Sequence, residues 1–233
     1  MDSSSFMRSS RCLGLIGGLG VGATVHYYER LVQGCEQLGL TLDIVITNAY
    51  TPRVFEYVEG QDGAGLAKYL NGYIVRMRAA GAEIAVVPAV TPHFCIRELL
   101  AIAPVPIVSI FDPLRDELSR RSIRRIAIFG TRFVIESDFF GALANVEIVR
   151  PQLDEIDLIH TTYVALAAAG KGSLEKRDKL TAVAKTLVQR DEVDSIVLAG
   201  TDLTLLFDEG NAEFPCVDCA ASHVREILSH IAK

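Results

Sequence analysis

The chain has 233 residues, half of them hydrophobic, and a formal net charge of -6 at pH 7. This length fits one large α/β domain or two smaller lobes, and the apolar content is ample for a folded core. Because the charge is negative and no run of five basic residues occurs, nucleic acid is not expected as a partner. No apolar stretch reaches the ~18 to 20 residues that a membrane span needs. We therefore expect a cytoplasmic protein with a disordered lead-in over residues 1–10.

The first half of the chain alternates short apolar runs with helical patterns. LGLIGG (13–18) predicts a buried strand that ends in glycine, and a helix is expected from about Thr24 to Gly39. A second strand (43–49), a helix from about Gly65 to Ala80 and a third strand (83–89) follow. Such alternation is typical of a parallel sheet covered by helices, and the continuous apolar strands agree because parallel strands are buried on both faces.

The second half of the chain repeats the first. Three segments recur in the same order: LGLIGG (13–18) as IAIFGT (126–131), AVVPAVT (85–91) as SIVLAGT (195–201), and APVPIVSI (103–110) as AEFPCVDC (212–219). Matching residues lie 113, 111 and 109 positions apart. The repeat predicts an α/β fold with two similar Rossmann-like lobes, parallel sheets and a pseudo-twofold relation. We assign residues 11–112 and 211–233 to lobe 1 and residues 113–210 to lobe 2.

The loops that follow the strands are expected to form the site. Ligands of parallel α/β folds bind outside the carboxyl ends of the strands. A pseudo-twofold axis would therefore line one cleft between the lobes with four loops: Gly17–Val21, Ala89–His93, Thr131–Ser137 and Gly200–Leu203. The first of these loops does not match G-x-G-x-x-G, so we interpret it as an N–H-rich loop suited to a carboxylate or another small anion.

Five cysteines form no regular framework, although Cys216 and Cys219 have C-x-x-C spacing. No second C-x-x-C exists to complete a zinc site. We interpret these two cysteines as small buried residues at a strand end, and the sequence predicts neither a metal nor a cofactor.

Six segments in order resemble the aspartate/glutamate racemase family: GGLGVGATVHYYERL (17–31), PAVTPH (88–93), FGTRFVIESDFF (129–140), IHTTYVALAAAGKG (159–172), LAGTDL (198–203) and VDCAASH (217–223). The resemblance extends over almost the whole chain. It implies a homodimeric protein that binds a small amino acid or carboxylic acid between two lobes without pyridoxal phosphate.

The resemblance also implies two catalytic cysteines, one in each lobe. An amino-acid α-proton is very weakly acidic, so racemisation needs a base on each face of the developing carbanion. The corresponding positions here are Ala89 and Gly200, and neither can ionise. Val90 replaces a third family residue, and this joint pattern favours natural divergence over an engineered replacement of one cysteine.

Several positions that bind substrate in the family keep suitable side chains. Thr91 and Thr201 match threonines that hold the substrate carboxylate. Arg53 and Lys171 match cations that would pair with a second carboxylate of a dicarboxylate ligand. The remaining substrate-binding candidates, which lie in loops of the expected cleft, are Leu19 and Thr131.

Two residues could replace the missing bases. Asp202 follows Thr201 where the family has glutamate, and the small Gly200 leaves room beside it. His93 is the second catalytic candidate because imidazole titrates near neutrality, although the matching family histidine more often supports its loop.

Three functions remain open from the sequence. The chain could act at the α-carbon of a small acidic amino acid through one non-cysteine base. It could instead decarboxylate, or isomerise between cis and trans, a small diacid, in which case Ala89 and Val90 would form an apolar wall that desolvates a leaving carboxylate. The third possibility is a catalytically inactive protein that binds an amino acid.

Overall fold

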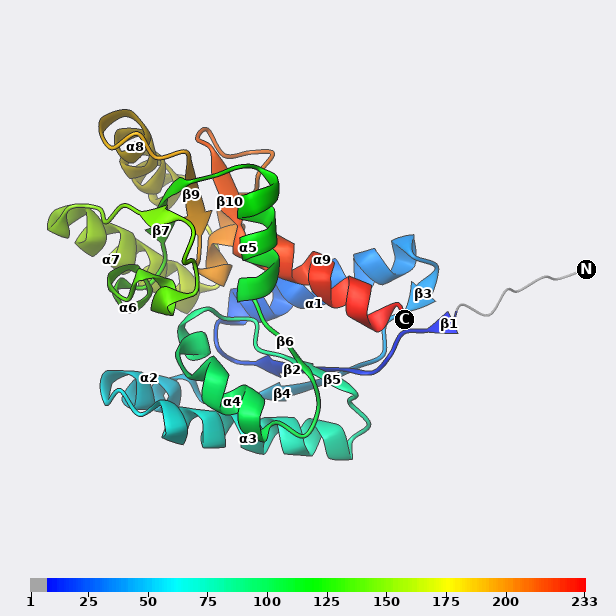
Figure 1. The fold of residues 1–233 in the computed structure, drawn as a ribbon. Helices are drawn as coiled ribbons and strands as arrows, with labels where there is room; N and C mark the ends of the chain where they lie inside the picture. The colour runs from blue at the N-terminus through cyan, green and yellow to red at the C-terminus, as the bar shows by residue number, and fades with distance from the viewer. Residues whose placement is uncertain (1–7) are drawn as a thin grey trace, which may run out of the picture.

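Two four-stranded parallel sheets organise the chain, as the computed structural model shows for residues 8–233 (Figure 1). The first sheet has the order β4 (Ile44–Asn48), β2 (Leu13–Gly17), β5 (Ile84–Val86), β6 (Ile107–Val108). The second has the order β8 (Glu147–Ile148), β7 (Arg125–Phe129), β9 (Ser195–Leu198), β10 (Cys216–Asp218). The strands β2, β5 and β6 thus occupy the same places as β7, β9 and β10, the three pairs that the repeat matched. The predicted α/β fold with two parallel-sheet lobes is confirmed.

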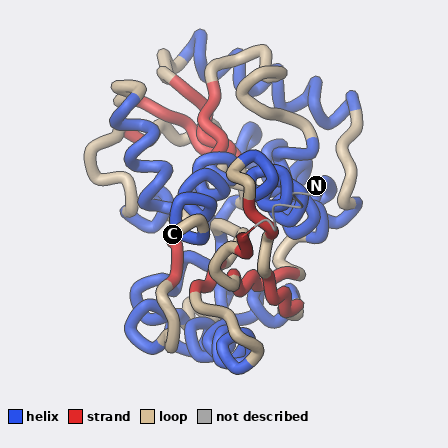
Figure 2. Tube along the Cα trace, turned by 90° about the vertical axis from the view of Figure 1, so that its right-hand side faces the viewer, coloured by secondary structure: helices blue, strands red, loops and turns tan. Residues whose placement is uncertain are grey.

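Helices cover both sheets, and the two lobes lie one above the other with α1 and α9 between them (Figures 1 and 2). The helices are α1 (Val21–Gln37), α2 (Thr51–Glu59), α3 (Gly63–Ala79), α4 (Ile96–Ile102), α5 (Phe111–Arg120), α6 (Arg132–Glu136), α7 (Leu153–Ala169), α8 (Leu174–Arg190) and α9 (Cys219–Ile231). Three 3-10 turns, η1 (Thr91–Cys95), η2 (Asp138–Gly141) and η3 (Thr201–Leu205), join them. Two of the turns, η1 and η3, follow equivalent strands. No helix within residues 8–233 is both long and apolar enough to cross a membrane.

The two lobes exchange the helices that follow their last strands. Helix α5 follows β6 of the first sheet, yet its Leu114 and Leu118 are buried in the core of the second lobe. Helix α9 follows β10 of the second sheet, yet Val224 and Ile227 are buried in a core that includes residues of β2. The two exchanged helices also pack against each other, so each lobe is completed by the other half of the chain.

The predicted lobe boundaries differ from the structure at one strand. Residues 211–233 were all expected in lobe 1, but β10 pairs with β9, so residues 216–218 belong to the second sheet. Only α9 packs on the first lobe. The physical reason is that β10 extends the hydrogen-bonded edge of its own sheet, whereas the apolar face of the next helix is buried across the interface.

Part of the expected disordered lead-in is ordered. Strand β1 (Arg8–Ser9) pairs in parallel with β3 (Leu40–Thr41), and the Ser10 N–H donates to the Thr41 carbonyl over 2.9 Å. Two backbone segments thus satisfy each other's polar groups. The rest of the predicted lead-in, residues 1–7, lies outside the described residues.

A buried hydrogen-bond chain connects three elements of the first lobe and its exchanged helix. The Tyr27 hydroxyl on α1 lies 3.0 Å from Nδ1 of His223 on α9, and Nε2 of His223 lies 2.9 Å from the Val108 carbonyl oxygen on β6. Since the carbonyl only accepts, Nε2 carries the proton and Nδ1 accepts from the tyrosine. Burial is the main cause that lowers the pKa of His223 to about 3, so the ring is neutral in the folded protein.

We expect the buried neutral His223 to make the protein less stable in acid. Below its ordinary pKa of 6.5 the unfolded chain binds a proton at this residue, whereas the folded chain does not until about pH 3. The free energy of unfolding should therefore fall across this window, by up to about 1.4 kcal/mol per pH unit from this group. Urea unfolding of His223→Gln between pH 7 and pH 4 should show a correspondingly weaker slope. An unchanged slope in His223→Gln would contradict the assignment.

Candidate functional site

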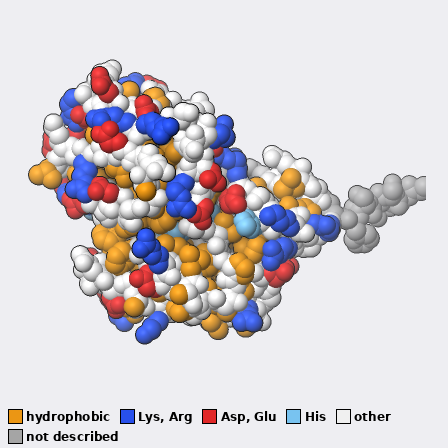
Figure 3. All heavy atoms as spheres, viewed as in Figure 1, with side chains coloured by type: hydrophobic (Ala, Val, Ile, Leu, Met, Phe, Trp, Pro, Cys, Tyr) orange, Lys and Arg blue, Asp and Glu red, His pale blue; other side chains and the backbone are white. Residues whose placement is uncertain are grey.

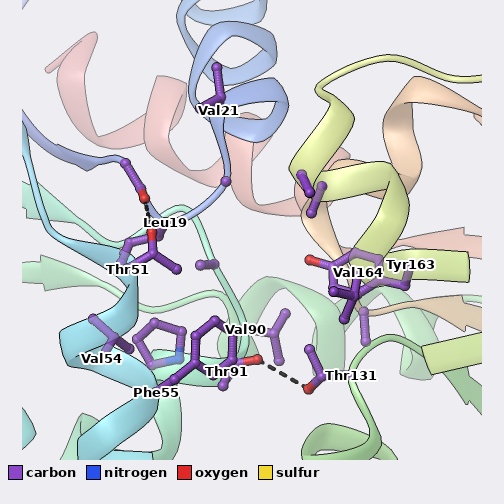
Figure 4. Close-up of a pocket in the computed structure, with 17 residues that line it drawn as sticks. Leu19, Val21, Thr51, Val54, Phe55, Val90, Thr91, Thr131, Tyr163 and Val164 are labelled. Carbon is purple, nitrogen blue, oxygen red and sulfur yellow. Dashed lines mark hydrogen bonds between the residues drawn. The ribbon is translucent and has the colours of Figure 1, made fainter. Parts of the chain in front are cut away.

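A pocket of about 330 Å³ lies between the two lobes, at the carboxyl ends of the central strands. Figure 3 shows hydrophobic side chains along the seam where the lobes meet, and Figure 4 shows the pocket itself. Its lining comes from the glycine-rich loop, α2, the loop after β5, the start of α6, and α7. Seventeen described residues line it: Gly18, Leu19, Gly20, Val21, Thr51, Val54, Phe55, Ala89, Val90, Thr91, Pro92, Thr131, Tyr163, Val164, Ala167, Ala168 and Ala199.

The glycine-rich loop is shaped by a carboxylate from the other lobe. Asp202 is fully buried, and its Oδ1 accepts a hydrogen bond of 2.9 Å from the Ala23 N–H in the first turn of α1. A Cβ atom at Gly20 would lie 2.4 Å from Oδ2 of Asp202, and one at Gly22 would lie 3.0 Å from Oδ1. Glycine is therefore required at both positions. Burial is the main cause that raises the pKa of Asp202.

Tyr163 occupies the place where a side chain at position 200 would lie. A Cβ atom at Gly200 would be only 2.2 Å from Cε2 and 2.7 Å from Cδ2 of the Tyr163 ring. The Tyr163 hydroxyl points towards the middle of the pocket and lies 3.4 Å from Oδ2 of Asp202 (Figure 4). Burial and the nearby Asp202 carboxylate raise the pKa of Tyr163 well above 10, so its hydroxyl is a proton donor at neutral pH.

The first lobe presents a methyl group where the second presents a phenol. Ala89 lines the pocket beside Val90, and both are almost completely buried. His93 stands behind this loop rather than in the pocket lining. Its Nδ1 lies 2.7 Å from the Ala89 carbonyl oxygen, and its Nε2 accepts from the Ile110 N–H over 3.3 Å. Both ring nitrogens are thus engaged, and burial lowers the pKa of His93 to about 4, so the structure gives this catalytic candidate a supporting position.

The threonine candidates divide into two groups. Thr91 and Thr131 line the pocket from opposite lobes, with their hydroxyl oxygens 3.3 Å apart (Figure 4). Thr201 does not line it. Its hydroxyl donates to the Pro88 carbonyl oxygen over 3.1 Å, a buried contact that joins the two lobes. Leu19 lies in the lining with the rest of its loop.

The two cationic candidates lie outside the pocket lining. Arg53 is on α2, where its Nη1 is 2.5 Å from Oε2 of Glu56 and its guanidinium lies 5.1 Å from the centre of the Tyr57 ring. Lys171 is exposed in the turn after α7. The structure therefore brings together Leu19, Thr91 and Thr131, and Asp202 reaches the pocket only through Tyr163.

Sequence reasoning missed the residues that give the pocket its character. Tyr163, Phe55 and Val164 were not selected, although Tyr163 stands out as the one aromatic side chain in a run of small residues, YVALAAAG. The available signal was Gly200, which stands where the resemblance implies a reactive cysteine. A space vacated in a packed protein is filled by another side chain, and here that side chain is Tyr163.

The chemistry that these side chains allow is narrow. The lining has four hydroxyl groups, on Thr51, Thr91, Thr131 and Tyr163, and none of the lining residues is charged. Residues 8–233 contain no group of three or more histidine, cysteine or acidic side chains placed to hold a metal ion. The pocket can donate hydrogen bonds to an anion and can enclose hydrocarbon, but it contains no thiol.

Comparisons with known proteins identify relatives over nearly the whole chain. The model of the Asp/Glu/Hydantoin racemase family matches residues 16–227. A candidate Asp/Glu racemase from Yersinia pestis is 24% identical over 96% of this chain and 100% of its own, with a TM-score of 0.81. An aspartate racemase homologue from Pyrococcus horikoshii is 22% identical over 96% and 100%, with a TM-score of 0.79. The Picrophilus torridus aspartate racemase is 18% identical over 94% and 93%, with a TM-score of 0.74.

We expect Gly200→Cys to destabilise the protein by about 1–3 kcal/mol, because the new side chain would overlap the Tyr163 ring. In the Tyr163→Ala background, which itself loses about 3–5 kcal/mol, the same substitution should be neutral or stabilising because the thiol enters vacated space. Urea unfolding of the two single variants and the double variant measures this coupling. Ala89→Cys is the matched control, since it adds one sulfur to an existing Cβ. An equal cost of Gly200→Cys in both backgrounds would refute the overlap.

Proposed function

The chain belongs to the Asp/Glu/Hydantoin racemase family, and from that premise we propose that it binds a small carboxylic acid in the pocket between its lobes and does not racemise it by the two-thiol route. One observation carries the proposal: the pocket lining has threonine hydroxyls that can bind a carboxylate, and it has no cysteine thiol. Thr91 and Thr131 face one another in the pocket. At the two positions that the resemblance assigns to cysteines, Ala89 has only a methyl group and Gly200 is covered by the Tyr163 ring.

A carboxylate would find several hydrogen-bond donors in this pocket. The backbone N–H groups of Leu19, Gly20 and Val21 have no acceptor among residues 8–233, and they adjoin the amino-terminal end of α1. The positive end of a helix dipole favours an anion at this place. On the opposite side of the pocket, one of the Thr91 and Thr131 hydroxyls donates to the other, and the second adds a further donor for the ligand.

Two-base racemisation is not supported because neither face of a bound ligand would meet a base. The methyl group of Ala89 cannot take a proton. The raised pKa of Tyr163 keeps its phenol protonated, so it can give a proton but cannot remove one from carbon at neutral pH. Asp202 is an ionisable group near the pocket, but its Oδ2 faces the Tyr163 hydroxyl rather than the pocket.

A specific observation favours decarboxylation as a second candidate function. In that reaction the bond to one carboxylate breaks, carbon dioxide leaves, and the electron pair stays on the α-carbon as an enediolate. The carbon then needs a proton donor and no base. Tyr163 would supply its hydroxyl proton, and water would return one to the phenolate. Ala89 and Val90 offer the apolar wall that disfavours a bound carboxylate and so promotes its loss.

The test is proton exchange followed by NMR in D₂O. With L- and D-aspartate and L- and D-glutamate we expect no exchange at the α-carbon, while small carboxylic acids raise the melting temperature. If a substituted malonate such as methylmalonate is decarboxylated, the product should contain one deuterium at the α-carbon. Tyr163→Phe, which keeps the ring, should then slow that reaction about 10²–10⁴-fold. Exchange with both enantiomers of one amino acid would show that two non-cysteine bases act here and would contradict the proposal.

We further propose that the protein forms a homodimer through an apolar face of the first lobe. Val21, Val25 and Tyr28 are exposed along α1, and Tyr28 shares a groove with Ile44 of the edge strand β4. Ile46 continues this face, close to the first turns of α1. A second copy would bury side chains that are costly to leave in water.

Light scattering after gel filtration tests the dimer. We expect twice the chain mass for the parent protein at micromolar concentration, and the monomer mass for Val25→Asp, because a buried carboxylate would lack a partner. Val75→Asp, at an exposed apolar position on α3, is the matched control and should stay dimeric. A monomeric parent protein would contradict the proposal.

A further inference from the structure

Resting on the proposed function, we infer that the ligand of this pocket is a small carboxylic acid whose remaining substituent is a hydrocarbon group, with no ammonium group and no distal carboxylate. The inference depends on which charges and which polar groups the pocket lacks, and on where its donors are placed. If the reaction is decarboxylation, this acid is the product.

A distal carboxylate would find no counter-charge. Arg53, the cation on the helix nearest the pocket, is paired with Glu56 and stacked on Tyr57, and it does not line the cavity. Lys171 is exposed and outside the lining as well. Burying an unpaired carboxylate against aliphatic side chains is strongly unfavourable, so an acidic side chain would bind poorly.

An ammonium group would find few acceptors. Three carbonyl oxygens that border the pocket already accept hydrogen bonds within the chain: Gly18 from the Thr51 hydroxyl, Gly20 from the Thr24 hydroxyl and N–H, and Ala89 from His93. The Asp202 carboxylate lies behind the lining and accepts from Ala23 and Tyr163. An α-ammonium group would thus be desolvated without an anionic partner.

The donors and the hydrocarbon surface are separated within the pocket. The hydroxyls of Thr91 and Thr131 and the N–H groups in the loop of Leu19 come from the loop ends. The two hydroxyls on the helices, those of Thr51 and Tyr163, already contact the Gly18 carbonyl oxygen and the Asp202 carboxylate. Aliphatic and aromatic side chains come from the helices α2 and α7, where Val54 and Phe55 stand opposite Val164 (Figure 4). Two further alanines on α7 extend this apolar surface.

This division fits one carboxylate and one hydrocarbon substituent. Phe55 and Val164 are respectively 40% and 43% exposed, so a hydrocarbon group placed between them would remove apolar surface of both the protein and the ligand from water. A cavity of about 330 Å³ is within the range of small-molecule sites.

The inference is tested by calorimetric titration with matched acids. Phenylacetate and isovalerate represent the proposed class, while succinate, aspartate and leucine each add one or both of the excluded charges. We expect the two hydrocarbon acids to bind at least tenfold more tightly than the other three. The double variant Thr91→Val/Thr131→Val should weaken phenylacetate binding by at least tenfold. Thr47→Val removes a buried hydroxyl outside the pocket and is the matched control, with unchanged affinity.

A second pair of variants separates the possible failures. Arg53→Ala should leave phenylacetate binding unchanged, because this side chain is outside the lining. If succinate or aspartate binds more tightly than phenylacetate and Arg53→Ala abolishes that binding, the inferred ligand class is overturned while the proposed carboxylate site stands. If none of the five acids binds at millimolar concentration, both the ligand class and the proposed function fail.

Discussion

The site depends on one buried hydrogen bond between the lobes, from the Ala23 N–H to the Asp202 carboxylate. The carboxylate lies at the amino-terminal end of α1, where the helix dipole favours a negative charge. It requires glycine at position 20, where a Cβ atom would lie 2.4 Å from Oδ2, and together with Leu205 it leaves no room for one at position 22. The shape of the loop in lobe 1 is therefore set by a residue of lobe 2, and the pocket exists only where both lobes meet.

The same carboxylate links the scaffold to the chemistry of the pocket. Oδ2 of Asp202 lies beside the Tyr163 hydroxyl, and the ring of Tyr163 fills the space next to Gly200. The two lobes thus share the order of their strands but not their contribution to the site. One offers the methyl group of Ala89 and the other a protonated phenol. The raised pKa of Tyr163 makes its phenol a proton donor, and none of the residues that line the pocket is charged.

The sequence could predict the strands and their pairing across the repeat, because continuous apolar runs and glycine ends are local signals. The sheet that β10 joins was not predicted, since a short apolar strand does not specify which sheet edge it extends. Proximity to a strand end was enough to place Leu19, Thr91 and Thr131 at the cavity. It was not enough for Thr201, whose hydroxyl donates to a carbonyl oxygen of the other lobe. Arg53 was selected through the family resemblance, but it is paired with the neighbouring Glu56 outside the cavity lining. Tyr163 reaches position 200 from another helix, a contact that no spacing along the chain records.

The most direct test of this account is a crystal structure of the protein with phenylacetate. The account predicts the carboxylate within hydrogen-bond distance of the Thr91 and Thr131 hydroxyls, the aromatic ring between Phe55 and Val164, and Tyr163 still packed on Gly200. A structure in which Arg53 turns into the pocket to bind the ligand, or in which Tyr163 leaves Gly200, would contradict it.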